Sequence, residues 1–310
     1  MTSAADDLGR IRLDMADLNR TIKLHPDDAA AISSRGQLHL ALGRYDEALA
    51  DLNLAIELNP GDAWTVSARG QAYRKLERYE EALADHDRAA ELAPDDAMVA
   101  CARGETYKAM LRFSEALADL TRAIELFPAF GWALSERGET YMLMERYDEA
   151  LADLNRAVEL NPDDSEAIGF RAETYRFMGR FEEALTDFNR ALGLDPGIEL
   201  SASDAWAVAS RGQTYLAMGR LDEALADLNR AVELDPEDWI IGARGQTYLA
   251  MGRLDEALAD LNRAVEPDPE YAEAIASRGE VYRLLGREAQ ALADFARAAE
   301  LDPGNRPAET

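Results

Sequence analysis

The sequence of 310 residues has only one cysteine, Cys101, and three histidines. A single cysteine excludes a disulfide within the chain. The first residues, MTSAADDLGR, lack the basic and apolar segments of a secretory signal. No apolar run approaches the roughly 20 residues that span a bilayer. We therefore expect a cytoplasmic protein without a membrane segment.

Positive charge is also scarce, because 33 lysines and arginines face 60 aspartates and glutamates, for a formal net charge of -27. A surface of this kind repels phosphate backbones and anionic lipids. We therefore expect neither nucleic acid nor a membrane surface as a partner. The hydrophobic share of 47% is nevertheless enough for a packed core.

Motifs that carry catalysis or bind cofactors are missing. The sequence has no HExxH, GxxxxGK[ST] or GxSxG, and no GxGxxG after a strand. His39 and His86 stand at core-type positions, which favours packing over metal binding. Acidic pairs such as Asp95 and Asp96 precede expected helices, where capping explains them better than calcium binding. We expect no enzyme activity, no cofactor and no metal.

What the sequence does contain is an internal repeat. Prolines recur every 34 residues from Pro26 to Pro196, a period typical of stacked helical hairpins. Within each period, apolar residues at helical spacing fill two stretches that are separated by a turn such as LGRYD. Residues 210–236 and 243–269 repeat the same sequence with two differences. Each repeat is therefore predicted to be a pair of helices.

Two proline spacings depart from this period. Pro236 follows Pro196 after 40 residues, and Pro269 follows Pro236 after 33. The segment GIELSAS, residues 197–203, thus contains an insertion, and it carries no catalytic side chains. We expect it to act as a hinge or to change the curvature between two repeats.

A recurring set of small and aromatic residues identifies the kind of hairpin. The first helix carries a glycine followed three residues later by a tyrosine, the second carries an alanine pair, and a proline closes the repeat, as at Gly138, Tyr141, Ala150, Ala157 and Pro162. This pattern resembles the tetratricopeptide repeat. The resemblance implies an all-α fold, an α-solenoid in which stacked helical hairpins form a right-handed superhelix. It also implies a non-catalytic scaffold or adaptor that binds a protein or peptide.

The predicted organisation has three parts. A half repeat with a lone second-type helix is followed by eight repeats and a tail, with the bounds 1–26, then 27–60, 61–94, 95–128, 129–162, 163–196, 197–236, 237–269 and 270–303, then 304–310. No additional polar helix covers either end of the array. Both ends are therefore candidate surfaces for a weak homo-oligomer.

Charges recur with the same period. Each first helix carries an arginine where the family usually has leucine, and each second helix carries an aspartate, as in Arg35 with Asp51 and Arg137 with Asp153. Because an unpaired charge in a packing position is costly, we predict Arg–Asp pairs between neighbouring helices. The alternative is an arginine row that binds an anionic ligand, which the equal number of aspartates disfavours.

In the family, the first helices line the concave groove in which peptides bind. We assign the same role to residues of this chain only by their equivalent positions in the repeat. The candidate groove residues are Trp64, Gln71, Arg74, Met98, Glu105, Lys108, Trp132, Glu139, Met142, Glu173, Arg176, Trp206, Gln213, Trp239 and Gln246. All four tryptophans fall in one register at the start of the first helix. Tryptophan is a common interface anchor, but packing against the preceding repeat is an equally good interpretation.

A second register always holds glutamine or glutamate. Its three central carboxylates, Glu105, Glu139 and Glu173, favour a ligand that bears lysine or arginine. The alternative is a solvated charged face, since basic residues lie on the same stripes. Three functions stay open: a peptide-binding adaptor, a scaffold that self-associates through uncapped terminal repeats, and a regulatory region of a larger signalling protein.

Overall fold

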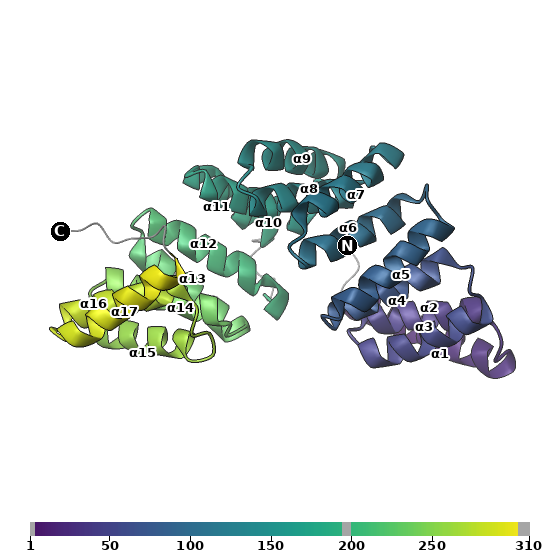
Figure 1. Ribbon diagram of the computed structural model, residues 1–310, viewed down its shortest axis with the longest axis horizontal. Coiled ribbons are helices and arrows are strands. Elements are labelled where there is room, and N and C mark those ends of the chain that lie inside the picture. The colour runs from purple at the N-terminus through teal and green to yellow at the C-terminus, as the bar shows by residue number, and fades with distance from the viewer. Residues whose placement is uncertain (1–3, 194–199, 303–310) are drawn as a thin grey trace. The chain divides into compact units, whose positions relative to one another are not determined.

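The computed structural model describes residues 4–193 and 200–302, and this part of the chain is helical, without a strand (Figure 1). The helices are α1 (Ala4–Leu24), α2 (Ala29–Ala41), α3 (Tyr45–Leu58), α4 (Ala63–Lys75), α5 (Tyr79–Leu92), α6 (Ala97–Ala109), α7 (Phe113–Leu126), α8 (Gly131–Leu143), α9 (Tyr147–Leu160), α10 (Ser165–Phe177), α11 (Phe181–Ala191), α12 (Ala205–Ala217), α13 (Leu221–Leu234), α14 (Asp238–Ala250), α15 (Leu254–Val265), α16 (Ala272–Leu284) and α17 (Glu288–Leu301), with the 3-10 turn η1 (Ala202–Asp204). The expected tail and residues 197–199 of the insertion lie outside the described residues.

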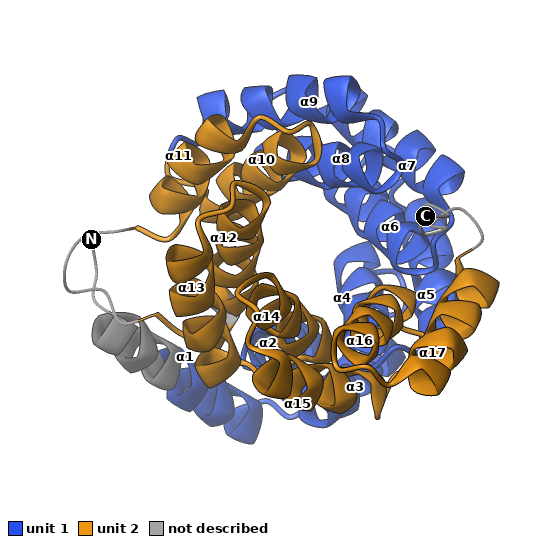
Figure 2. Cartoon of the chain, turned by 90° about the vertical axis from the view of Figure 1, so that its left-hand side faces the viewer, with its two compact units in different colours: residues 1–162 blue, residues 163–310 orange. Residues whose placement is uncertain are grey.

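The chain divides into two compact units, Met1–Pro162 and Asp163–Thr310, coloured separately in Figure 2. Unit 1 holds α1 to α9, and unit 2 holds α10 to α17. From α2 onward the helices pack in pairs, and each pair packs against the next one within its unit. We call the first helix of a pair the A helix and the second the B helix. The predicted all-α fold of stacked helical hairpins is confirmed.

The A helices form the inner layer of each unit. In unit 1, α4 contacts α2 and α6, and α6 contacts α8; in unit 2, α12 and α14 contact their neighbouring A helices in the same way. Among the described residues, successive B helices make no comparable contact. Each unit therefore curves with its A helices on the inside (Figure 2).

Short polar side chains and one turn residue set the ends of the helices. The Asp96 side chain accepts hydrogen bonds from the backbone N–H groups of Met98 and Val99, and Asp28, which precedes α2, accepts one in the same way. The predicted capping is confirmed at these positions. The turn between A and B helices requires a residue with a positive φ, which Gly179 supplies in unit 2 with φ 72°.

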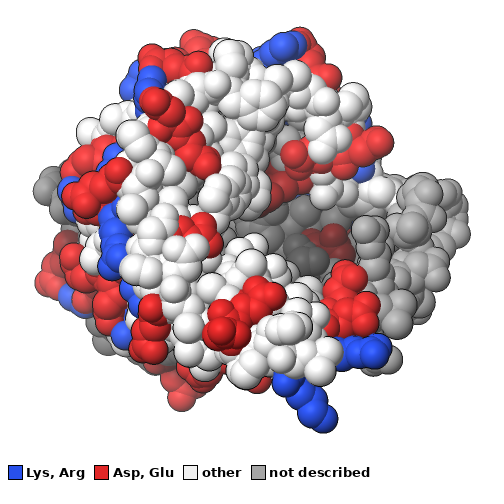
Figure 3. Space-filling model, turned by 90° about the vertical axis from the view of Figure 1, so that its right-hand side faces the viewer, with Lys and Arg blue, Asp and Glu red and all other residues white. Residues whose placement is uncertain are grey.

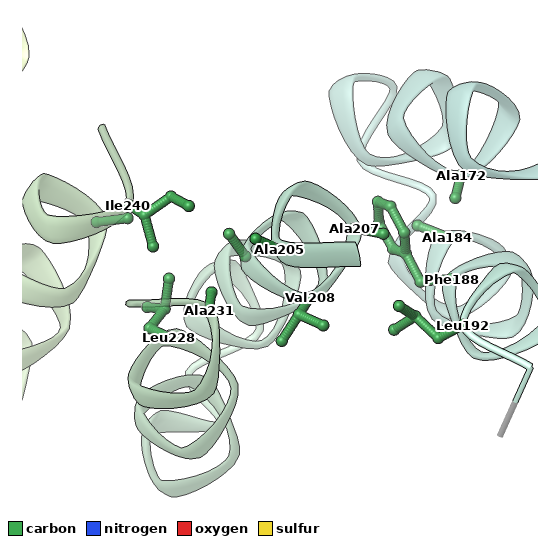
Figure 4. Close-up of a cluster of buried hydrophobic side chains, with 12 residues drawn as sticks. Ala172, Ala184, Phe188, Leu192, Ala205, Ala207, Val208, Leu228, Ala231 and Ile240 are labelled. Carbon is green, nitrogen blue, oxygen red and sulfur yellow. The ribbon is translucent and has the colours of Figure 1, made fainter. Parts of the chain in front are cut away.

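The core lies between neighbouring hairpins and consists of small and branched side chains. In unit 2, Phe188, Val208, Leu228 and Ile240 come from four successive helices and fill the space between them, with buried alanines around them (Figure 4). Small residues let the helices approach closely. In unit 1, a Cβ added to Gly138 would lie only 2.7 Å from Cγ of Leu154, as expected for a tight helix crossing.

Candidate interaction surface

The inner surface of unit 1 exposes three large apolar side chains at the start of successive A helices. Trp64 on α4, Met98 on α6 and Trp132 on α8 are 49%, 39% and 50% exposed. They occupy one register on helices that contact each other in order. We call these three residues the apolar row. Large apolar side chains exposed in one register on neighbouring helices are typical of an interaction site.

The same register in unit 2 is packed instead. The Trp206 ring lies 5.7 Å from the ring of Phe170 and 6.5 Å from that of Phe188, measured between centroids. A Cβ added to Gly169 would lie 3.0 Å from Cζ3 of Trp206. Trp239 packs against the core of Figure 4, and its Nε1 donates to a carboxylate oxygen of Glu237 at 2.6 Å. At this register the large apolar side chains are thus exposed in unit 1, whereas in unit 2 they pack against the preceding repeat.

Beside the apolar row lies a buried ionic cluster on α4, α6 and α8. Nη2 of Arg74 donates to Oε2 of Glu105 at 2.5 Å, and Nζ of Lys108 donates to Oε2 of Glu136 at 2.6 Å and to Glu139. We call these five residues the carboxylate cluster. Four of them are candidate groove residues from the sequence, and the fifth, Glu136, is not; it lies one helical turn after Trp132 on α8.

Burial and like charges raise two pKa values in the carboxylate cluster. Burial first and Glu136 second raise the pKa of Glu105 to about 7, although Arg74 and Lys108 oppose the change. Burial also raises the pKa of Glu139. Burial lowers the pKa of Lys108, but Glu136 and Glu139 outweigh it, so that the pKa of Lys108 is raised overall. The cluster therefore holds more carboxylate than its cations neutralise.

Other predicted groove residues are occupied by contacts within the chain. Glu173 on α10 is buried and pairs with Arg176. Nε2 of Gln246 donates to Oε1 of Glu273 at 3.0 Å. Met142 is buried, with 7% of its surface exposed. Gln71 and Gln213 are partly buried on their A helices.

The predicted Arg–Asp pairs are confirmed in both units. Each arginine donates through Nε and Nη2 to both carboxylate oxygens of an aspartate on the B helix of its own hairpin, at 2.6–2.9 Å. The pairs are Arg35–Asp51, Arg69–Asp85, Arg103–Asp119, Arg137–Asp153, Arg171–Asp187, Arg211–Asp227, Arg244–Asp260 and Arg278–Asp294. Bidentate pairing of this kind leaves little capacity for an anionic ligand.

The arginines also connect neighbouring hairpins, which the sequence analysis missed. Nη1 of Arg69 on α4 donates to Oδ1 of Asn53 on α3 at 2.7 Å, and Arg211 on α12 reaches Asn189 on α11 at 2.8 Å. The signal was available, because these asparagines stand two residues after the pairing aspartates of their B helices. Each such arginine therefore holds three successive helices in register.

Within residues 4–193 and 200–302, no three His, Cys, Asp or Glu side chains gather in a group that could hold a metal ion. None of the helices there has the length and apolar character needed to cross a membrane. Acidic side chains outnumber basic ones on the face drawn in Figure 3, in keeping with the net charge.

Family models match most of the chain. Models described as tetratricopeptide repeat match residues 29–62, 67–96, 131–164, 163–237 and 272–305, and one described as TPR repeat matches residues 245–286. No curated protein matches the sequence at a significant level.

Solved structures resemble the chain in fold. One chain of the APC/C hetero-tetramer Cut9-Hcn1 matches with a TM-score of 0.77 and 16% identity, over 98% of this chain and 58% of that one. A tetratricopeptide repeat protein from Parabacteroides merdae matches with a TM-score of 0.62 and 19% identity, over 82% and 98% of the two chains. PilF of Pseudomonas aeruginosa matches with a TM-score of 0.55 and 17% identity, over 67% and 92%. The chain thus spans little more than half the length of the first of these.

Proposed function

The chain belongs to the tetratricopeptide repeat family, and from this premise we propose that it is a cytoplasmic, non-catalytic adaptor that binds a peptide segment of a partner protein on the A helices of unit 1. Members of this family generally bind proteins or peptides. The apolar row carries the proposal, because Trp64, Met98 and Trp132 are exposed on neighbouring helices without a covering segment in the described part of the chain. Aromatic side chains in such positions contribute most of the binding energy at interfaces.

The alternative of a scaffold that self-associates through its terminal repeats has less support. An array that grows by stacking would place a further A helix on α17. The B helices of earlier repeats offer Asn53 or Asn262 to the arginine of the next A helix, whereas α17 has Ala296 at this position. An arginine stacked there would lose one hydrogen bond, which makes α17 a poorer surface for extension.

A selection experiment tests the adaptor proposal. A displayed library of random short peptides is selected on the full chain, and the selected peptides are titrated calorimetrically into wild type and a Trp64→Ala, Trp132→Ala double variant. We expect the double variant to lose at least about tenfold in affinity, since each truncated anchor removes on the order of 1–2 kcal/mol. Circular dichroism should show unchanged helicity, because both rings are half exposed.

Leu292→Ala is the matched control. Leu292 lies on the B helix α17 and is 69% exposed. The substitution therefore removes exposed apolar surface that is not on an A helix. It should leave peptide affinity unchanged. Selected peptides that bind the double variant as tightly as wild type would remove the apolar row from the binding site. Sedimentation over a concentration series tests the alternative, for which mass should rise with concentration.

A further inference from the structure

The apolar row and the carboxylate cluster are parts of one surface. Nε1 of Trp132 donates to Oε1 of Glu136 at 3.1 Å, and Glu136 in turn accepts from Lys108. Trp132 therefore exposes half its surface while its polar edge rests on a carboxylate. A ligand that covers the Trp132 ring comes within reach of the cluster.

The cluster lacks one positive charge. Within the described part of the chain, three carboxylates, those of Glu105, Glu136 and Glu139, hydrogen-bond to two cations, Arg74 and Lys108. All five side chains are at least four-fifths buried, so water screens the excess charge poorly. A cation added at this surface would form an ion pair with the unbalanced carboxylate and a cation–π contact with the Trp132 ring.

We propose that unit 1 binds a partner segment that carries a lysine or arginine next to apolar side chains, the apolar side chains covering Trp64, Met98 and Trp132 and the cation becoming the third positive charge of the carboxylate cluster. This inference rests on the proposed function and specifies the chemistry of its ligand. An acidic segment would be repelled both by the surplus carboxylate and by the net charge of -27. A purely apolar segment would leave the cluster unbalanced.

Binding of such a segment is linked to a proton on Glu105. The charged or titratable groups that act on Glu105 are Arg74 and Lys75 on α4, Cys101 and Lys108 on α6, and Glu136 on α8. The pKa of Glu105 is raised to about 7, so near neutral pH this carboxyl is partly protonated in the free protein. A bound cation favours the ionised form, and binding therefore releases a proton.

The linkage predicts the direction and size of a pH effect. At about pH 6 most Glu105 carboxyls must lose a proton before the cation is fully paired, whereas at about pH 8 most are already ionised. The affinity for the cationic segment should rise by up to about tenfold between these pH values. The peptides contain no histidine and have an acetylated N-terminus, so that no group of the ligand titrates in this range.

The experiment uses peptides from the same library, selected on the full chain at about pH 8. We expect lysine or arginine beside apolar residues to be enriched in the selected peptides. For one such peptide, replacement of its lysine by norleucine should weaken binding at least about tenfold. In calorimetric titrations, Glu105→Gln should abolish the pH dependence of affinity for the lysine peptide.

Glu173→Gln supplies the matched control. Glu173 is as buried as Glu105 and also pairs with an arginine, Arg176, but it lies on α10 in unit 2. This variant should keep the wild-type pH dependence. Equal binding of the lysine and norleucine peptides, or an unchanged pH dependence in Glu105→Gln, would overturn the inference. If the lysine and norleucine peptides still bound more weakly to the Trp64→Ala, Trp132→Ala double variant, the adaptor proposal would stand without the inference about a cation.

Discussion

The two units use the same tryptophan register in opposite ways. In unit 1, Trp64 and Trp132 are half exposed, whereas in unit 2 Trp206 lies on the backbone of Gly169 in the preceding repeat. The residue that corresponds to Gly169 ahead of Trp132 is Cys101, which has a side chain. At Gly169 no Cβ stands in the way of the Trp206 ring, which lies 3.0 Å from the place that a Cβ would take. The absent Cβ helps to explain the packing of Trp206, but Trp239 packs against the core although Ala209 stands at this position in its preceding repeat.

Three of the turns between A and B helices in unit 1 also differ from those of unit 2, whereas the first turn of unit 1 uses Gly43. In unit 1, Glu77, Leu111 and Glu145 adopt φ values of 58–59°. The corresponding turns of unit 2 use glycine, as at Gly219 with φ 73°. Residues with a Cβ in this conformation cost about 1 kcal/mol more than glycine. Unit 1 thus combines the exposed apolar row with three strained turns, and we expect it to be the less stable unit.

Truncation of the tryptophans is the most direct way to break this comparison. Trp206→Ala should lower the free energy of unfolding by about 3 kcal/mol, because it leaves a cavity beside Phe170 and Phe188. Trp64→Ala should cost less than about 1 kcal/mol, since its ring is half exposed. Urea denaturation followed by circular dichroism measures both values. Equal costs would mean that Trp206 is not a core residue.

Loss of an Arg–Asp pair should affect the units equally. Arg137→Ala in unit 1 and Arg211→Ala in unit 2 each leave an aspartate without its bidentate partner, and the side chains of these aspartates are only 11% and 14% exposed. We expect each to lower the free energy of unfolding by about 2 to 3 kcal/mol, near the low end for broken buried pairs because both arginines retain some exposure.

The control for these variants is an exposed ion pair. Arg156 in unit 1 is 54% exposed and pairs with Glu159 one turn along the same helix. Arg156→Ala should change stability by less than about 0.5 kcal/mol. A similar small effect of Arg137→Ala would show that the interhelical pairs are as weak as surface pairs, and that the arginine register carries little of the packing.

Features that depend on local periodicity could be predicted from the sequence. The hairpins, the aspartate caps and the Arg–Asp pairs each follow from residues that recur at fixed spacing. Arg103 and Asp119, for example, are sixteen residues apart and lie on either side of one turn. The equivalent pair in every other repeat has the same separation. Because arginines and aspartates occur in equal numbers at equivalent positions, pairing with each other is the simplest way for their charges to be neutralised.

Features that depend on competition between neighbouring repeats could not be predicted. Glu105 was expected to face a ligand, and nothing in the sequence indicated that Arg74 of the preceding A helix donates to it. Glu136 could not be recognised because the equivalent positions of the other repeats, such as Ala68 and Ala102, hold no charged residue. Trp206 packs against Gly169, Phe170 and Phe188 of the preceding repeat, and the register of Trp206 gives no sign of these neighbours. A register assigns a residue to a helix face, whereas its exposure depends on the side chains opposite.

Acid should destabilise unit 1 through His86, which replaces the buried leucine or phenylalanine of other repeats. Burial first, then the charges of Arg74 and Arg103, lower the pKa of His86 to about 3. Because its folded pKa lies below the unfolded value of about 6.5, stability is present above pH 6.5 and is lost as pH falls from there toward 3. The loss should be about 2 kcal/mol near pH 5.

His86→Leu should remove this sensitivity. Leucine at this position would pack against Gly70 as Leu154 packs against Gly138. Denaturation of both proteins at about pH 8 and about pH 5 should show a stability difference that grows by about 2 kcal/mol in favour of the variant at the lower pH. The matched change Leu228→His in unit 2 should create a second acid-sensitive site. A pH-independent difference would exclude His86 as the cause.

The smallest expected effect concerns the strained turns. Leu111 has φ 58° and is 73% exposed, so its side chain contributes little packing while its backbone carries a penalty. Leu111→Gly should raise the free energy of unfolding by about 0.5 to 1 kcal/mol, because the relief of strain exceeds the entropy that glycine adds to the unfolded chain. The reciprocal change, Gly219→Leu in unit 2, should lower it by at least as much. If Leu111→Gly were destabilising, the difference in turn residues could not explain a less stable unit 1, and the exposed row alone would distinguish the units.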